Sequence, residues 1–249
     1  GSSLTAISTN RWTIHPQNMI QIDIVPENIG RQYPVSVGIL GDAKLALTQL
    51  VSQLGDYSGD KEFLSDMLDR KMEWKKHLEE SAIADSEATP VPPIALQKEL
   101  QKHLLEGSVF CVDAGNPGAW THYTTFPKNM AYFKPVNYGN MGFSLGAALG
   151  CKEAEPEREV IALLGDGSLG MTLGDLETIG REALPIIIIL VNDSAYGNIK
   201  QEELYKMGEN RYIGVEFKDY DYINVAKTFG VDGCIVTKAS QIGDALQTA

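Results

Sequence analysis

The stretch EVIALLGDGSLGMTLGDLETIGREALPIIIILVND, residues 159–193, decides the fold of this chain. It begins with an apolar run over residues 159–165 and ends with a second apolar run over residues 185–192. Apolar runs of this length predict strands whose two faces are both covered, and the segment near residues 172–183 predicts a helix between them. A strand–helix–strand unit of this kind joins parallel neighbours through a right-handed crossover.

The same alternation continues on both sides of this stretch. Strands are predicted over residues 109–115 and 233–236, and helices over residues 94–106, 142–153, 219–229 and 239–249. Repeated alternation predicts an α/β fold, a doubly wound parallel sheet flanked by helices. Ligands of such sheets bind beyond the carboxyl ends of the strands.

The chain before this domain divides into two further segments. Residues 18–25 and 35–40 predict strands, and Asp42 predicts the N-cap of an amphipathic helix. Two strands and a helix bury little surface, so residues 4–55 are expected to be a partial α/β segment. Residues 56–93 predict a charged helix and a stiff proline-rich linker, and residues 94–249 form the main domain.

Charge and composition exclude several kinds of partner. The net charge of −12 argues against nucleic-acid binding, because a polyphosphate backbone would be repelled. The longest aliphatic run, residues 186–191, is too short to span a bilayer. The three cysteines, Cys111, Cys151 and Cys234, show no metal-ligand spacing and fit the reducing cytoplasm, where we expect the protein to act.

Two acidic residues follow neighbouring predicted strands. Asp166 lies between Gly165 and Gly167, and Asp193 follows the next strand of the crossover unit. Both carboxylates can therefore meet at one edge of the sheet. Mg²⁺ prefers one or two carboxylates together with phosphate oxygens, and a backbone carbonyl near Ala195 would add a ligand. The alternative is that the two aspartates only cap helices.

A glycine-rich segment, NYGNMGFSLGAALG over residues 137–150, precedes these turns. Gly142, Gly146 and Gly150 recur at every fourth position and predict a smooth helix face. Close packing alone would explain that stripe. Asn140 and Met141 precede it on a loop and could face a ligand.

These motifs together resemble one family. The segment from residue 165 to residue 193 resembles the thiamine-diphosphate fingerprint, and residues 108–249 resemble the pyrophosphate-binding domain of acetolactate-synthase-like enzymes. DAGNPGAW, residues 113–120, resembles the loop that precedes the cofactor in that family. Residues 19–47 resemble the end of its central domain, which implies that residues 4–55 are the C-terminal part of that domain.

The resemblance implies the cofactors and their ligands. Thiamine diphosphate and Mg²⁺ are expected, and Met141 matches the bulky residue that holds the cofactor in its bent shape. The implied magnesium ligands are Asp166, Asp193 and the carbonyl of Ala195. The implied cofactor-binding residues are Asn116, Asn140, Met141, Gly165, Asp166, Gly167, Ser168, Asp193, Ala195, Tyr196, Gly197 and Asn198.

The chain departs from the family at Asn192-Asp193, where paired asparagines are usual. An extra carboxylate beside a diphosphate is repulsive, by about 4 kcal/mol per charge pair at about 4 Å and an effective dielectric constant of about 20. The metal must offset that repulsion, so cofactor binding is expected to depend on Mg²⁺. Asp193→Asn is then expected to be tolerated, and Asp166→Ala to be destructive.

The resemblance implies an enzyme that acts on 2-oxo acids, with decarboxylation of pyruvate followed by carboligation as the leading reaction. A 2-oxo acid decarboxylase, an aldehyde lyase or a sulfoacetaldehyde acetyltransferase of the same cofactor class stays open, and Pro117 stands where synthases often have a histidine. A non-catalytic nucleotide-binding α/β module is the alternative from another class. A homodimer or tetramer is expected.

The catalytic residue is not identified in this chain. In the family, the activating glutamate belongs to a separate N-terminal domain of a neighbouring subunit, and nothing in the sequence corresponds to that domain. The chain alone is therefore expected to be inactive. Only the end of the flavin-binding central domain is matched, so no flavin is expected.

Overall fold

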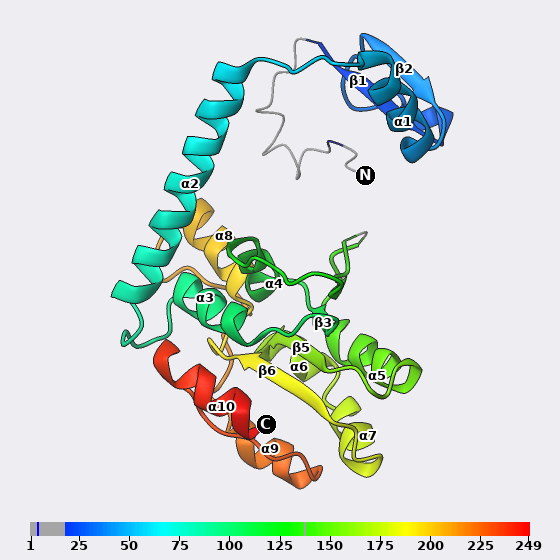
Figure 1. Cartoon of the computed structure of the whole chain (residues 1–249). Helices are drawn as coiled ribbons and strands as arrows, with labels where there is room; N and C mark the ends of the chain where they lie inside the picture. Colours follow the sequence, from blue (N-terminus) through cyan, green and yellow to red (C-terminus); the bar gives the residue numbers. More distant parts are fainter. Residues whose placement is uncertain (1–3, 5–17, 137) are drawn as a thin grey trace. The chain divides into compact units, whose positions relative to one another are not determined.

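The structure, a computed structural model, describes residue 4, residues 18–136 and residues 138–249 (Figure 1). The chain divides into two compact units, residues 1–69 and residues 70–249. Most of residues 4–17, the start of the first predicted segment, lies outside the described residues.

The first unit contains two short strands and a helix. β1 (Ile20–Asp23) and β2 (Val37–Leu40) pair in parallel, with Ile20 opposite Val37. A 3₁₀ turn, η1 (Pro26–Asn28), lies between them, and α1 (Ala43–Leu54) follows. The carboxylate of Asp42 accepts a 2.9 Å hydrogen bond from the amide of Leu45, so the predicted N-cap is confirmed. The leucines on the predicted apolar face of α1 are exposed: Leu45, Leu47, Leu50 and Leu54.

A long charged helix and a proline-rich segment precede the main sheet. α2 (Lys61–Ala84) covers the predicted charged helix. α3 (Pro93–His103) starts with a proline at its first position, where the missing N–H costs no helical hydrogen bond. The segment between them has the proline-rich sequence that predicted a linker.

The second unit is built on a four-stranded parallel sheet in the order β4-β3-β5-β6. Its strands are β3 (Val109–Val112), β4 (Ala131–Phe133), β5 (Val160–Gly165) and β6 (Ile186–Val191). The register places Gly165 opposite Val191. The turns that follow β5 and β6 therefore leave the sheet side by side.

The helices of this unit that follow α3 lie between these strands or follow β6. They are α4 (Asn116–Trp120), η2 (Thr121–Tyr123), α5 (Ser144–Ala154), α6 (Asp166–Met171), α7 (Asp175–Arg181), α8 (Gly197–Met207), α9 (Tyr222–Thr228), η3 (Ala239–Gln241) and α10 (Ile242–Thr248). None of the helices in the described ranges is both long and apolar enough to cross a bilayer.

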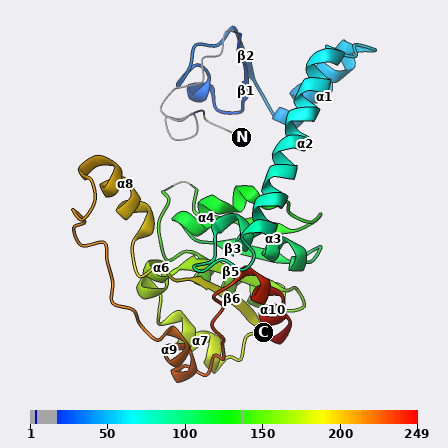
Figure 2. The ribbon, with the colours of Figure 1, turned by 90° about the vertical axis from the view of Figure 1, so that its left-hand side faces the viewer.

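Both faces of the sheet are covered, which confirms the predicted doubly wound α/β fold (Figures 1 and 2). Residues of α5, α6 and α7 pack on one face, against Val109, Ala162 and Leu164 of the strands. On the other face, Phe110 and Leu163 form a second cluster, and α3 and α10 pack beside β6 there. Burial of these side chains contributes about 2 kcal/mol each.

β6 differs from the two central strands in its burial. Its even-numbered residues pack on one cluster and its odd-numbered residues on the other, as its unbroken apolar sequence predicts. The strand lies at one end of the described sheet, so all six residues remain only half-buried.

One predicted strand is wrong. Residues 233–236, all of them described, form no strand, although Val236, at the end of this segment, and Val231, just before it, pack against different core clusters. Apolar side chains hold this segment against the core without the hydrogen bonds of a paired strand. An apolar sequence pattern alone does not distinguish such a segment from a strand. The helix predicted near residues 172–183 corresponds to α7, and the short helix α6 that precedes it was not predicted. β4, α4 and α8 were not predicted, because they are short or lack a clear apolar period.

Candidate functional site

A cavity of about 290 Å³ lies at the carboxyl ends of β3, β5 and β6. Every predicted site residue except Asn140 lines it. They come from four places in the sequence: the segment after β3, the loop before α5, and the turns after β5 and β6. We name residues 139–143 the Met141 loop, residues 165–168 the GDGS turn, and residues 192–197 the Asp193 turn.

Asp166 is the most deeply placed carboxylate of the cavity. It is 2% exposed, and its Oδ1 accepts a 2.8 Å hydrogen bond from the amide of Gly167. Its other oxygen, Oδ2, is buried and has no hydrogen-bonding partner among the described residues. An orphaned carboxylate oxygen costs free energy, typically about 1–3 kcal/mol or more for a charged group. The site is therefore electrostatically incomplete as the protein alone forms it.

The pKa values of both cavity aspartates are raised. For Asp166, burial is the main cause, the amide of Gly167 opposes it, and the negative charge of Asp193 raises the pKa further. Asp193 is more exposed, and partial burial of its carboxyl raises its pKa, while the amide of Ala195 and the charge of Lys200 oppose that rise. A cation between two carboxylates that line one cavity would stabilise their charged forms.

The chain bends sharply in the Asp193 turn to bring its groups toward Asp166. Ser194 adopts φ +52°, and the amides of Ser194 and Ala195 lie near enough to the Asp166 carboxylate to lower its pKa. Residues 215–217 hold this bend through two backbone hydrogen bonds. The Tyr196 amide donates to the carbonyl of Val215 at 2.8 Å, and the Phe217 amide donates to the carbonyl of Ser194 at 2.7 Å.

Gly197 has no room for a side chain. A Cβ at this position would lie 2.3 Å from Oδ2 of Asp193 and 3.2 Å from Nδ2 of Asn116. The glycine thus allows the Asp193 carboxylate and the Asn116 amide to approach each other. Asn116, predicted on a loop, is the first residue of the short helix α4.

Met141 and Tyr196 meet above the GDGS turn. A Cβ on Gly167 would lie 2.7 Å from the ring of Tyr196 and 3.0 Å from Cε of Met141. The ring of Tyr196 stacks edge-on against Phe217, with 4.5 Å between the ring centroids. Two side chains from distant segments therefore form one wall of the cavity directly over the glycine.

The donor set suits a hard cation that also binds an anionic ligand. Within the part of the chain that the structure describes, no three His, Cys, Asp or Glu side chains cluster as a ready-made metal site. Asp166 and Asp193 supply two carboxylates, which is the number Mg²⁺ uses when phosphate oxygens complete its shell. The orphaned Oδ2 of Asp166 and the close backbone at Gly167 and Gly197 fit such a shared ion.

A comparison with protein families shows which family the chain belongs to. The model described as "Thiamine pyrophosphate enzyme, C-terminal TPP binding domain" matches residues 113–249, more than half of the chain. The chain belongs to the thiamine pyrophosphate enzyme family. The match begins directly after β3 and contains every residue that lines the cavity.

Curated relatives in the thiamine pyrophosphate enzyme family cover nearly all of this chain. A putative thiamine pyrophosphate-containing protein, YdaP, of Bacillus subtilis is 30% identical over 92% of the chain and 39% of its own length. A probable acetolactate synthase large subunit of Methanococcus aeolicus is 29% identical over 99% of the chain and 42% of its own length. A sulfoacetaldehyde acetyltransferase of Alcaligenes xylosoxydans xylosoxydans is 27% identical over 93% of the chain and 42% of its own length. The chain thus spans about two fifths of these relatives, and the predicted resemblance is confirmed.

One residue that supports the cavity was not predicted from the sequence. Asp113 is fully buried. Its carboxylate accepts hydrogen bonds from the amides of Gly142 and Phe143, in the loop before α5, and of Ser144, the first residue of α5. Its position, directly after a buried strand and before a glycine loop, resembles that of Asp166. That repeated pattern is the signal that could have identified it.

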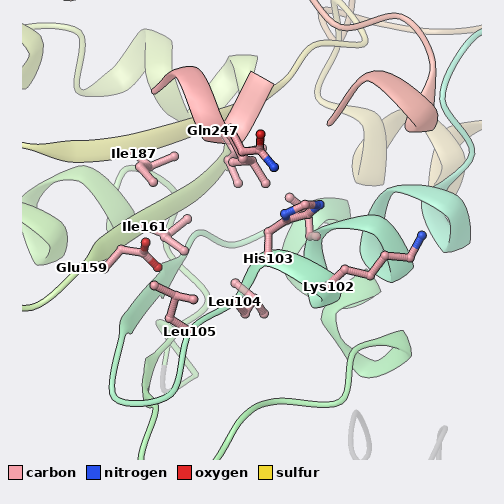
Figure 3. A pocket seen from close by; sticks show the side chains of 11 residues that line it. Lys102, His103, Leu104, Leu105, Glu159, Ile161, Ile187 and Gln247 are labelled. Carbon is pink, nitrogen blue, oxygen red and sulfur yellow. The ribbon is translucent and has the colours of Figure 1, made fainter. Parts of the chain in front are cut away.

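A second cavity, of about 250 Å³, lies away from these residues (Figure 3). Glu159, Ile161 and Ile187 line it at the amino ends of β5 and β6, together with Leu104 and Leu105. Burial raises the pKa of Glu159, and Lys152 opposes that shift. Because the strands are parallel, this cavity lies at the opposite end of the sheet from the Asp166 site.

Proposed function

We propose that this chain binds thiamine diphosphate through a shared Mg²⁺ ion and is part of an enzyme that acts on 2-oxo acids. The orphaned, buried Oδ2 of Asp166 beside Asp193 is the observation that supports this most directly. The leading reaction is acetolactate-synthase-like, a decarboxylation of pyruvate followed by carboligation. Relatives named as acetolactate synthase large subunits support this reaction.

We assign the metal to the two turns of the site. Asp166, Asp193 and the carbonyl of Ala195 would hold Mg²⁺, and Gly167, Ser168 and Asn116 would contact the diphosphate. Mg²⁺ would offset the repulsion between the two carboxylates and the anionic diphosphate.

The remaining residues would shape the cofactor and its surroundings. Met141 would prop the cofactor in its bent form, while Tyr196, Gly197 and Asn198 would continue the cavity wall. Asn140, on the same loop as Met141, would also contact the cofactor. The bound cofactor supplies the nucleophilic carbon and the electron sink for decarboxylation. The chain's part is to orient it and to exclude water.

The wider enzyme is also a proposal. We infer a homodimer or tetramer that works in the cytoplasm, and the three free thiols among the described residues fit a reducing compartment. By the family resemblance the activating glutamate comes from another domain. We therefore expect this 249-residue chain to bind the cofactor without turnover.

Other activities of the same cofactor class stay open. A sulfoacetaldehyde acetyltransferase is favoured among them, because relatives with that name match nearly the whole chain. Carboligase and acetyltransferase assays on a protein that also carries the family's N-terminal domain would separate the two.

Calorimetric titration tests the proposed cofactor. Thiamine diphosphate and ATP are each titrated into the chain, with Mg²⁺ and with EDTA. We expect binding of thiamine diphosphate only with Mg²⁺. Preference for ATP would instead support a nucleotide-binding module, and equal affinity for thiamine diphosphate in EDTA would refute the metal site.

A further inference from the structure

Asp113 has an arrangement of partners that the proposed function does not yet explain. Its side chain is 0% exposed and accepts five hydrogen bonds. Oδ1 accepts from the amides of Ala114 and Gly142, at 2.9 and 3.0 Å, and from the hydroxyl of Ser168 at 2.9 Å. Oδ2 accepts from the amides of Phe143 and Ser144, at 2.9 and 2.8 Å.

These partners belong to two different parts of the site. Gly142 and Phe143 are the last residues of the Met141 loop, and Ser144 starts α5. The N-cap residue of α5, Phe143, has no capping side chain of its own, so the carboxylate of Asp113 satisfies amides that the helix leaves unpaired. Ser168 belongs to the GDGS turn, which would contact the diphosphate.

We propose that Asp113 is a positioning residue that holds the Met141 loop against the GDGS turn, so that the prop and the diphosphate contacts keep a fixed separation. This inference rests on the proposed cofactor and deepens it. Asp113 does not line the cavity, and it acts through Met141 on one side and Ser168 on the other.

An isosteric amide cannot replace this carboxylate, because all five partners donate. The amide introduced by Asp113→Asn retains most bonds when its oxygen stays at the Oδ1 position, where three donors converge. Its NH₂ group then faces the amides of Phe143 and Ser144, donor against donor. The change therefore removes the bonds from Phe143 and Ser144, at the end of the Met141 loop and the start of α5, while those from Gly142 and Ser168 persist.

Two ligands separate positioning from general stability. Inorganic diphosphate with Mg²⁺ would use the metal, the GDGS turn and Asn116 but not Met141, whereas thiamine diphosphate would also need the Met141 prop. Affinities for both are measured by calorimetry on the whole chain and on Asp113→Asn, Met141→Ala and the double variant. Ser168→Ala serves as the contrasting variant, because it releases the GDGS turn instead of the loop.

We expect Asp113→Asn to weaken thiamine diphosphate by about tenfold and diphosphate by less than about threefold, in line with two lost hydrogen bonds. Met141→Ala should show the same selectivity, and the double variant should lose no more than Met141→Ala alone. Ser168→Ala should weaken both ligands by similar factors. Equal losses for both ligands in Asp113→Asn, or additive losses in the double variant, would overturn the proposal.

Three further outcomes also test the proposal. If Asp113→Asn does not fold, a double-mutant cycle of Met141→Ala and Ser168→Ala replaces it. Strictly additive losses of binding free energy for thiamine diphosphate in that cycle would contradict the proposal. If the unaltered chain binds neither ligand with Mg²⁺, the proposed function fails, and the inference fails with it. Binding by the unaltered chain with unchanged preference in Asp113→Asn refutes the inference alone.

Discussion

At the scale of single residues, the site depends on two carboxylates that the protein does not neutralise by itself. Asp166 leaves a buried oxygen without a partner among the described residues, and the charge of Asp193 adds to the cost of ionising it. Buried polar groups in natural proteins rarely lack a partner, and a bound ion is one group that can supply it. The two residues do not contribute equally, because Asp166 is buried and Asp193 is exposed.

Substitution should reveal this difference between the two aspartates. Asp166→Ala is expected to lower Mg²⁺-dependent affinity for thiamine diphosphate by about a hundredfold or more, the loss of about 3 kcal/mol typical of a buried charged partner. Asp193→Asn should keep the affinity within about threefold, because an amide oxygen still binds the metal and repels the diphosphate less. Calorimetry measures both.

Asp232→Ala, at an exposed position of the same unit, is the matched control and should bind like the unaltered chain. If Asp193→Asn were as damaging as Asp166→Ala, the second carboxylate would be essential and the assigned roles would be wrong.

The raised pKa values of Asp166 and Asp193 predict how binding depends on pH. Metal binding requires both carboxylates to be ionised, so affinity should rise with pH through pKa values above the ordinary 3.8 and then level off. Without metal, the stability of the fold changes with pH in the opposite direction to the binding affinity. The folded chain holds these protons more tightly than the unfolded chain, so the free energy of unfolding falls as pH rises through the same window.

Titrations in buffers of different ionisation enthalpy measure this proton release directly. Asp193→Asn removes one of the two titrating groups and should release fewer protons when metal binds. Proton uptake on binding, or affinity independent of pH between about 4 and 6, would contradict the assignment of these carboxylates as ligands.

At the scale of elements, the Asp193 turn decides where the second carboxylate points. Its backbone is bent by the left-handed Ser194 and tied to residues 215–217, while the ion pair between Lys200 and Glu216, at 2.8 Å, joins α8 to the same segment. Gly197 completes the turn because any side chain there would displace the Asp193 carboxylate.

Gly197→Ala tests this turn. The added Cβ would lie 2.3 Å from Oδ2 of Asp193, so the carboxylate must rotate away. We expect cofactor affinity with Mg²⁺ to fall by about tenfold with little change in thermal stability, because the displaced atom ends a mobile side chain. Calorimetry and a thermal melt together give the result.

Gly170→Ala is the control within the neighbouring α6, since nothing lies within 4 Å of a Cβ at that position. It should bind the cofactor normally. A Gly197→Ala variant with unaltered affinity would show that the Asp193 carboxylate is not held in place by this turn.

At the scale of the whole molecule, the parallel sheet is what joins the separate segments. β3, β5 and β6 end at one edge, so residues from the sequence positions near 116, 141, 166 and 196 line one cavity. The exposed leucines of α1 and the half-buried β6 show that other surfaces of the chain remain apolar.

Binding at this edge should stabilise the folded chain as a whole. At a ligand concentration about 100 times Kd, linkage adds about 2.7 kcal/mol, which corresponds to a rise of about 5–10 °C in Tm for a domain of this size. A thermal melt with thiamine diphosphate and Mg²⁺ should show that rise, and one with EDTA should not. A rise produced equally by Mg²⁺ alone would point to metal binding without the cofactor.

The sequence by itself determined the α/β class, the strands over residues 159–165 and 185–192, and the pair Asp166 and Asp193 as candidate ligands. Periodicity and strand-end composition are local, so they can be read along the chain. Only the tertiary structure decided the rest: that residues 233–236 form no strand, that Gly197 leaves room for Asp193, and that Asp113 joins two parts of the site. These depend on contacts between residues far apart in sequence, and a local pattern carries no record of which distant donor a buried carboxylate will meet.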